Sequence, residues 1–235
     1  MKYRTFGRLG WQVSEIGFGA WALGGSAWGG QDDDESVRAL HRALDLGCNF
    51  IDTAEGYGDG RSEKIIGRVL KERRSANPGE RIYVATKIPP QPPGAWPPGH
   101  HDPIGSRFSE AYLRERVEAR LANLGVEAID LLQLHTWTRA WNRNPTALAV
   151  LRTLQKEGKL LGTGISTPEQ DQNSLVDLMR QGWLDAVQVI YNIFEQEPAA
   201  EFLPTAREHG VGVIVRVACD GDGSNSSSKF SVSDV

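Results

Sequence analysis

Cysteine is scarce in this sequence of 235 residues, since only Cys48 and Cys219 are present. They stand far apart and match neither a metal-ligand nor a redox spacing, so we expect two free thiols in a reducing compartment. Long apolar runs are also lacking, both at the length of a membrane-spanning helix and in the opening residues, where a signal peptide would need one. These absences predict a soluble, cytoplasmic protein.

An excess of positive charge is missing as well. The sequence has 26 Lys and Arg against 30 Asp and Glu, a net charge of −4. Such a balance is not typical of a protein that binds nucleic acid or an anionic membrane, so we expect a small-molecule substrate. His100 and His101 have no third ligand at a useful spacing, and no metal site is predicted. The glycine-rich segment 23–30 does not match the G-x-G-x-x-G dinucleotide fingerprint.

The chain is long enough, and at 40% hydrophobic residues apolar enough, for one well-buried domain. Apolar segments of strand length alternate with segments of helical periodicity from residue 16 onward. Strands are expected at 16–21, 49–52, 81–87, 129–134, 161–165, 185–191 and 212–217. Helices are expected at about 34–46, from about 62, at 109–125, around 148–154, from a capping box at 167–170, and at about 202–209.

Strictly alternating strands and helices, with strands that are nearly all apolar, predict a parallel sheet covered by helices. We expect an α/β fold of the (β/α)8 TIM-barrel type, incomplete at about seven strands, with an N-terminal hairpin at 3–14. A doubly wound sheet is the alternative. Residues 1–217 would form the barrel and residues 218–235 a Gly/Ser-rich tail. Without an eighth unit, the edges of the first and seventh strands would stay unpaired.

Polar groups recur where the predicted strands end. Asp52, Lys87 and His135 each follow or close an apolar strand, and Tyr57 lies in the turn after Asp52. A (β/α)8 barrel collects its catalytic groups at the carboxyl ends of its strands, so these side chains should meet on one face. Ser166 and Gln188 close two later strands. Polar groups that recur around the sheet favour the barrel over a doubly wound sheet, in which they would gather at a single switch point.

The four groups suit carbonyl chemistry. A buried lysine forms a charge pair with a buried aspartate, and a lysine close to a phenol lowers the pKa of the tyrosine. The phenol of Tyr57 could then give up a proton near neutral pH, while His135 hydrogen-bonds the reacting oxygen. Such a set polarises a carbonyl and protonates it as it becomes an alkoxide.

Over roughly residues 3–217 the chain resembles the aldo-keto reductases, barrel enzymes that move a hydride between a nicotinamide cofactor and a carbonyl. The resemblance rests on Asp52 in Phe-Ile-Asp-Thr-Ala, Tyr57 in Glu-Gly-Tyr-Gly, Lys87 in Val-Ala-Thr-Lys-Ile and His135 in Leu-Leu-Gln-Leu-His. It implies an NADP-dependent enzyme that uses NADPH, with NAD possible. Tyr57 would be the general acid, Lys87 and Asp52 would tune it, and His135 would orient the carbonyl.

The same resemblance implies a set of cofactor contacts: Gly19, Ala20, Trp21, Asp52, Ser166, Gln188 and Arg216. Ser166 and Gln188 match positions that hold the nicotinamide amide in the family. Arg216 stands where many members place a tyrosine that stacks on the nicotinamide. The family's pyrophosphate loop is replaced here by Ser-rich sequence, and its eighth strand and helix are absent.

Alternatives therefore remain open. The chain is either an active carbonyl reductase or a catalytically impaired fragment or pseudoenzyme without productive cofactor binding. A lyase that uses Lys87 as a Schiff-base amine is a third reading. Trp21, Trp96, Trp137 and Trp141 either line an apolar substrate pocket or belong to the core. The sequence leaves the physiological substrate and the oligomeric state open.

Overall fold

The computed structural model describes residues 1–25, 30–92, 94–218 and 229–232. Seven parallel strands curl into a barrel in the order β3, β4, β5, β6, β7, β8, β9, as the sequence predicts. They are β3 (Ile16–Gly19), β4 (Phe50–Asp52), β5 (Tyr83–Ile88), β6 (Ile129–Leu134), β7 (Leu160–Ser166), β8 (Ala186–Ile190) and β9 (Gly212–Arg216). Because all seven run the same way, their carboxyl ends meet at one rim of the barrel.

An additional strand, β10 (Lys229–Val232), fills the gap between β3 and β9. It pairs antiparallel with both neighbours, and Ser231 is opposite Ile16 on one side and Val215 on the other. The expectation that the edges of the first and seventh strands stay unpaired is therefore wrong. A strand of only four residues after a Ser-rich segment gives a weak sequence signal even though Phe230 and Val232 alternate with polar residues, yet its backbone pairs with two open edges at once.

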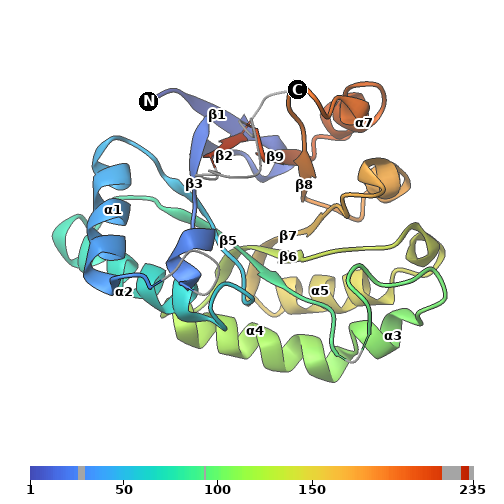
Figure 1. Cartoon of the computed structure of the whole chain (residues 1–235), viewed down its shortest axis with the longest axis horizontal. Helices are drawn as coiled ribbons and strands as arrows, with labels where there is room; N and C mark the ends of the chain where they lie inside the picture. Colours follow the sequence, from blue (N-terminus) through green and yellow to red (C-terminus); the bar gives the residue numbers. More distant parts are fainter. Residues whose placement is uncertain (26–29, 93, 219–228, 233–235) are drawn as a thin grey trace.

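Helices cover the outside of the strands. The longer ones are α1 (Asp33–Asp45), α2 (Arg61–Ala76), α4 (Glu110–Leu124) and α5 (Thr146–Lys156), and the shorter ones are α3 (Ile104–Arg107), α6 (Val176–Arg180) and α7 (Phe202–Glu208). Figure 1 shows α1 beside α2 on one flank and α4 and α5 along the next, and both pairs are in contact. Among the described residues, no helix has the length and hydropathy needed to cross a membrane.

The sequence explains where α1 begins. The Asp32 carboxylate accepts hydrogen bonds from the amides of Asp34 and Glu35, which caps the helix, and Leu40 and Leu44 are buried four residues apart. The predicted capping box at 167–170 is wrong. The Thr167 hydroxyl donates to the Gln172 side chain at 2.8 Å instead, and α6 starts only after a 3-10 turn, η4 (Gln172–Leu175).

The hairpin of β1 (Tyr3–Phe6) and β2 (Trp11–Ser14) lies across the amino-terminal ends of the barrel strands, at the top of Figure 1. Its Phe6 ring lies 5.6 Å from the ring of Phe50 in β4. Gly212 leaves room for it, because a Cβ there would lie 2.7 Å from the Phe6 ring. The hairpin therefore fills the end of the barrel opposite the rim, and the rim is the open end.

Closure of the barrel by β10 can be tested at Ser231. Ser231→Pro removes a backbone N–H from a strand that is paired on both sides, so we expect a loss of about 1 to 3 kcal/mol of unfolding free energy. Ser231→Ala, which keeps the N–H, is the control. Urea denaturation measures both, and equal stability of the two variants would show that β10 does not contribute to the folded barrel.

Candidate active site

A buried ion pair lies at the centre of the rim. The Lys87 ammonium, on β5, is 2.6 Å from the Asp52 carboxylate at the end of β4, and both side chains are almost completely buried. The second Asp52 oxygen accepts a hydrogen bond of 3.0 Å from Gln188 on β8. Charges that leave water need partners of this kind, and the two carboxylate oxygens are both engaged. The structure thus brings Asp52, Lys87 and Gln188 together at this rim.

The turn after β4 places Tyr57 beside this pair. The Lys87 ammonium donates to the backbone carbonyl of Thr53 at 2.8 Å and lies 5.2 Å from the centre of the Tyr57 ring. The amide of Glu55 donates back to the Lys87 carbonyl at 3.0 Å. Lys87 therefore holds the turn at two points between Asp52 and Tyr57.

Close backbone contact with a second segment limits the position of the Tyr57 turn. Gly58 has φ +68°, and a Cβ there would lie 2.2 Å from the Gly24 carbonyl oxygen. Gly24 ends the short 3-10 helix η2 (Trp21–Gly24), and a Cβ on it would lie 2.6 Å from the Tyr57 backbone. Two glycines are needed here because the backbones touch.

His135 directly follows β6, and its amide donates to the Ile88 carbonyl at the end of β5. Its ring centre lies 6.1 Å from that of Tyr57 in an edge-to-face arrangement. On another side, Trp96 from the segment between β5 and α3 packs edge-to-face on His135 at 5.1 Å. The four predicted catalytic side chains, Asp52, Tyr57, Lys87 and His135, thus lie together at one rim.

The pKa of Tyr57 differs from the expectation. Burial raises it above its ordinary value and outweighs Lys87, whose charge and hydrogen bonding lower it. The Asp52 carboxylate raises it further. The prediction of a lowered Tyr57 pKa is therefore wrong in sign, because burial outweighs the Lys87 charge. The phenol is held in its protonated form, which is the form of a proton donor.

Burial lowers the pKa of His135 well below the ordinary value of histidine, and the positive charges of Lys87 and Arg216 lower it further. The ring is therefore neutral near pH 7. A neutral imidazole carries one N–H donor and one acceptor, so His135 can donate a hydrogen bond to an oxygen without adding charge.

The predicted cofactor-binding residues of the first strand flank Asp52. Gly19 pairs with Asp52 across β3 and β4, and the amide of Ala20 donates to the Asp52 carbonyl at 2.9 Å. Trp21 begins η2 and is 42% exposed. The rest of this glycine-rich segment includes residues 26–29, which are outside the described residues.

Ser166 and Arg216 end β7 and β9 on the other side of the rim, and Gln188 lies in the middle of β8 between them, two residues before the strand end at which the sequence predicted it. Ser166 pairs with Gln188, and the amide of Thr167 donates to the Gln188 carbonyl. The Arg216 guanidinium donates to the Thr167 carbonyl at 3.3 Å and lies 3.6 Å from Glu169. Burial lowers the pKa of Arg216, and the Glu169 charge acts against this. Its buried Nε has no hydrogen-bond partner.

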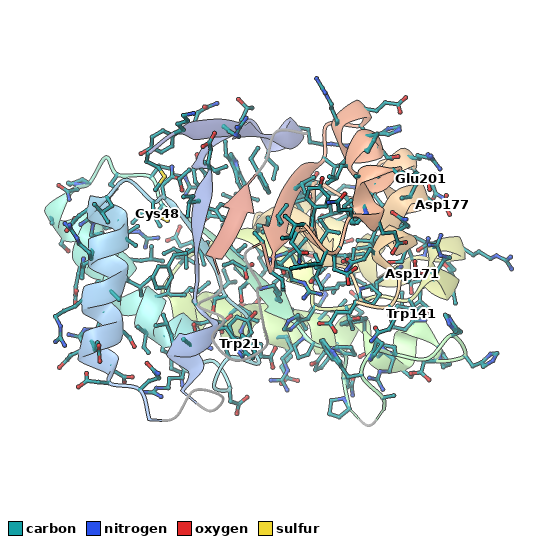
Figure 2. The ribbon with its side chains drawn as sticks, turned by 45° about the horizontal axis from the view of Figure 1, so that its top comes forward. Trp21, Cys48, Trp141, Asp171, Asp177 and Glu201 are labelled. Carbon is teal, nitrogen blue, oxygen red and sulfur yellow. The ribbon has the colours of Figure 1, made fainter. Side chains whose placement is uncertain are left out.

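The tryptophans divide into two groups. Trp137 and Trp141 are buried in the main apolar core, where their rings meet at 5.1 Å, so they do not line a pocket. Trp21 and Trp96 are exposed at the rim. Figure 2 shows Trp21 well separated from Trp141. The pocket hypothesis therefore survives only for Trp21 and Trp96.

The histidines of the long segment after β5 do not form a metal site. His100 contacts the Thr138 hydroxyl at 3.2 Å, and His101 is exposed. Within the part of the chain that the structure describes, no three His, Cys, Asp or Glu side chains come together as metal ligands. Cys48 is a buried free thiol, and Cys219 lies outside the described residues.

Sequence reasoning missed a buried polar group behind the site. Glu55, Glu63 and Arg120 are each at most 6% exposed, although a helical pattern read through Leu121 puts Arg120 on the outer face of α4. The position of Arg120 seven residues after Leu113 is the signal that could have revealed it. Gln133, next to Lys87 in the sheet, is also fully buried, and neither of its amide atoms has a hydrogen-bond partner.

Comparison with known proteins decides the family. Residues 15–224 match the profile described as "Aldo/keto reductase family". The chain belongs to this family. It is 33% identical over 226 residues to the NADH-specific methylglyoxal reductase of Escherichia coli (strain K12). The matched region covers 92% of this chain and 66% of that protein.

Solved structures agree with the assignment. The holo form of aldo-keto reductase AKR11C1 from Bacillus halodurans matches with a TM-score of 0.72 and 30% identity, over 92% of this chain and 65% of that one. An aldo-keto reductase from Klebsiella pneumoniae in complex with NADPH matches with a TM-score of 0.68 and 25% identity, over 90% and 66%. The chain thus spans less than two thirds of the length of these relatives.

The protonation of Tyr57 can be measured directly. Because burial raises its pKa, we expect the ultraviolet difference between the native chain and Tyr57→Phe to show tyrosinate only above about pH 10. The measurement is a spectrophotometric titration of both proteins in the folded state. A Tyr57 signal that appears between pH 7 and 9 would contradict the raised pKa.

The ion pair can be tested by removing one partner. Lys87→Met leaves the Asp52 carboxylate buried without its countercharge, and we expect it to cost about 3 to 5 kcal/mol of unfolding free energy. Adding Asp52→Asn removes the uncompensated charge and should recover most of the loss. Chemical denaturation compares the three proteins. A loss below about 1 kcal/mol in the single variant would mean that the pair is not buried as described.

Proposed function

We propose that this aldo/keto reductase family member is an NAD(P)H-dependent oxidoreductase that reduces aldehyde or ketone carbonyls to alcohols, with Tyr57 as the general acid. The observation that carries this proposal is the position of the Tyr57 ring at the open rim, 5.2 Å from the Lys87 ammonium and 6.1 Å from the ring of His135. The raised pKa of Tyr57 and the lowered pKa of His135 agree with it. Among the described side chains of this rim, Tyr57 is the group best suited to give a proton to an oxygen.

The proton transfer follows from the charges. Addition of a hydride to a carbonyl carbon places negative charge on the oxygen, which must gain a proton to become an alcohol. Tyr57 supplies that proton, and the adjacent Lys87 stabilises the phenolate that remains. Neutral His135 donates a hydrogen bond that fixes the oxygen and stabilises its developing charge. Asp52 balances the Lys87 charge and keeps the ammonium in place.

The rim residues fit a nicotinamide cofactor. Arg216 has a buried Nε without a partner, and it lies beside Ser166 and Gln188 where a polar ring substituent could bind. A reduced nicotinamide bound there would supply the hydride. The NADPH complex of the Klebsiella protein supports NADP as the cofactor, and the NADH specificity of the Escherichia coli relative keeps NAD as the alternative. Gly19, Ala20, Trp21 and Asp52 would form the opposite side of the site.

A Schiff-base reaction at Lys87 is less suitable. Its nitrogen donates to the Asp52 carboxylate and to the Thr53 carbonyl. An amine nucleophile needs a free lone pair directed at the substrate. The ion pair holds this nitrogen as a hydrogen-bond donor, so we assign Lys87 to tuning Tyr57.

The second candidate function is a catalytically impaired relative without productive cofactor binding. It is favoured by the eighth barrel position, where the short strand β10 runs antiparallel to both of its neighbours. A titration of the purified chain with NADPH, followed by quenching of tryptophan fluorescence, separates the two. Saturable micromolar binding supports the reductase, and absence of binding to a folded sample supports the impaired relative.

The general acid is tested by Tyr57→Phe. Loss of the proton donor should reduce NADPH consumption with an aromatic aldehyde by about 10² to 10⁴-fold, while the cofactor still binds. Tyr3→Phe is the matched control, because the Tyr3 hydroxyl binds the Gly47 carbonyl in the hairpin region, far from the rim. Absorbance at the NADPH band measures turnover. Unchanged turnover in Tyr57→Phe would end the assignment of Tyr57.

A further inference from the structure

Arg120 has an unusual place on α4. The helix turns Leu113, Val117 and Leu124 into the core, and Arg120 lies on this same buried face with 4% exposure. A buried arginine carries a cost in lost hydration and is normally retained where it meets carboxylates. Its partners therefore indicate what it does.

Arg120 meets two carboxylates that belong to the segment around Tyr57. Its guanidinium Nε lies 2.6 Å from a Glu63 oxygen, and its Nη1 forms an ion pair with Glu55. Glu55 stands two residues before Tyr57, and Glu63 lies in the first turn of α2, six residues after it. One side chain of α4 thus holds both ends of the turn that carries the phenol.

The two glutamates also contact β5 at and next to Lys87. The Thr86 hydroxyl donates to Glu63 at 2.6 Å, and Thr86 is the neighbour of Lys87 in β5. The amide of Glu55 donates to the Lys87 carbonyl at 3.0 Å. The buried group therefore connects α4 to the backbones on which Tyr57 and Lys87 stand.

Other side chains complete the hydrogen bonding of the two carboxylates. Arg116, one turn before Arg120, donates to Glu55 at 2.9 Å, and Asn123 donates to Glu63 at 2.9 Å. Burial raises the pKa of both Glu55 and Glu63, and the charge of Arg120 acts against this in each case. Arg120 is the cation that the two carboxylates share.

We propose that Arg120 is a positioning residue for the reaction: its ion pairs with Glu55 and Glu63 fix the Tyr57 turn against β5, so that the phenol stands at the distance from Lys87 and His135 that proton transfer requires. The inference rests on the proposed function, since it assigns a role in that same site. The ion pairs of Arg120 are with Glu55 and Glu63 and not with Asp52, Tyr57, Lys87 or His135, so it acts through the backbone of the turn.

A residue that merely stabilised the fold would give a different result, and the chain allows the two roles to be separated. Removing Arg120 alone leaves the buried Glu63 carboxylate without a cation and Glu55 with Arg116 as its remaining one, which destabilises a protein whatever the role of the arginine. The variant Arg120→Met/Glu55→Gln/Glu63→Gln removes all three charges together. Its two glutamines keep their shape and can still accept from Arg116, Thr86 and Asn123. The stability of this variant should therefore stay close to that of the native chain, while the ion pairs of Arg120 with Glu55 and Glu63 are lost.

A matched control lies on the same helix. Arg114 bridges Glu110 and Glu157 at 2.9 Å each, but on the surface. The variant Arg114→Met/Glu110→Gln/Glu157→Gln makes the same three chemical changes away from the Tyr57 turn. We expect this control to keep native turnover, since exposed ion pairs contribute little.

The experiment measures turnover and amide hydrogen exchange in the native chain and both triple variants. We expect the Arg120 triple variant to lose about 10 to 100-fold in kcat with KM unchanged, because a small displacement of a catalytic group costs this much. The amides of Glu55, Tyr57 and Gly60, which are hydrogen-bonded within or next to the turn, should exchange at least about tenfold faster. Those of α1 should not change.

Each outcome decides the question. Native kcat and native exchange of the turn in the Arg120 triple variant would overturn the proposal. If the native chain itself shows no turnover, the proposed function fails, and the exchange of the turn alone decides whether Arg120 positions it. If the triple variant does not fold, Arg120→Lys replaces it: a single ammonium cannot match both carboxylates, so kcat should fall with KM retained, and native kcat in Arg120→Lys would again overturn the proposal.

Discussion

The buried pair of Asp52 and Lys87 is the interaction on which the rest of the site depends. Two opposite charges in a nearly dry environment must keep short contact, and this fixes the ends of β4 and β5 relative to each other. The turn that carries Tyr57 is then bound to Lys87 through Thr53 and Glu55. Every group of the rim is therefore placed with respect to one ion pair.

That pair also sets the protonation of its neighbours. Burial of the Tyr57 phenol outweighs the positive charge of Lys87, and the Asp52 charge adds to the effect of burial, so the pKa of the tyrosine rises. Burial lowers the pKa of His135, and the positive charges of Lys87 and Arg216 lower it further. The result is a neutral acid next to a neutral hydrogen-bond donor, a combination that suits the carbonyl reduction we propose.

The sequence predicted the parts that depend on local pattern. Apolar runs ending on Asp52, Lys87 and His135 identified three strands and the rim, because burial on both faces of a parallel strand leaves a clear signal. Features that depend on tertiary contacts could not be predicted from local pattern. The sign of the Tyr57 pKa shift, the closure by β10 and the buried place of Arg120 each depend on groups far apart in the chain, and α6 starts late because Thr167 binds Gln172.

The antiparallel direction of β10 reverses the geometry of one barrel position. In the seven parallel strands the chain arrives at the rim where the strand ends, and the next strand is reached over the outside. Lys229, the first residue of β10, pairs with Phe18 near the rim end of β3, and Arg216 ends β9 at the same rim. Both ends of the connection between β9 and β10 therefore lie at the rim. Any lengthening of this connection would add material above the site, whereas lengthening any other strand-to-strand crossover through its helix would thicken the outer wall.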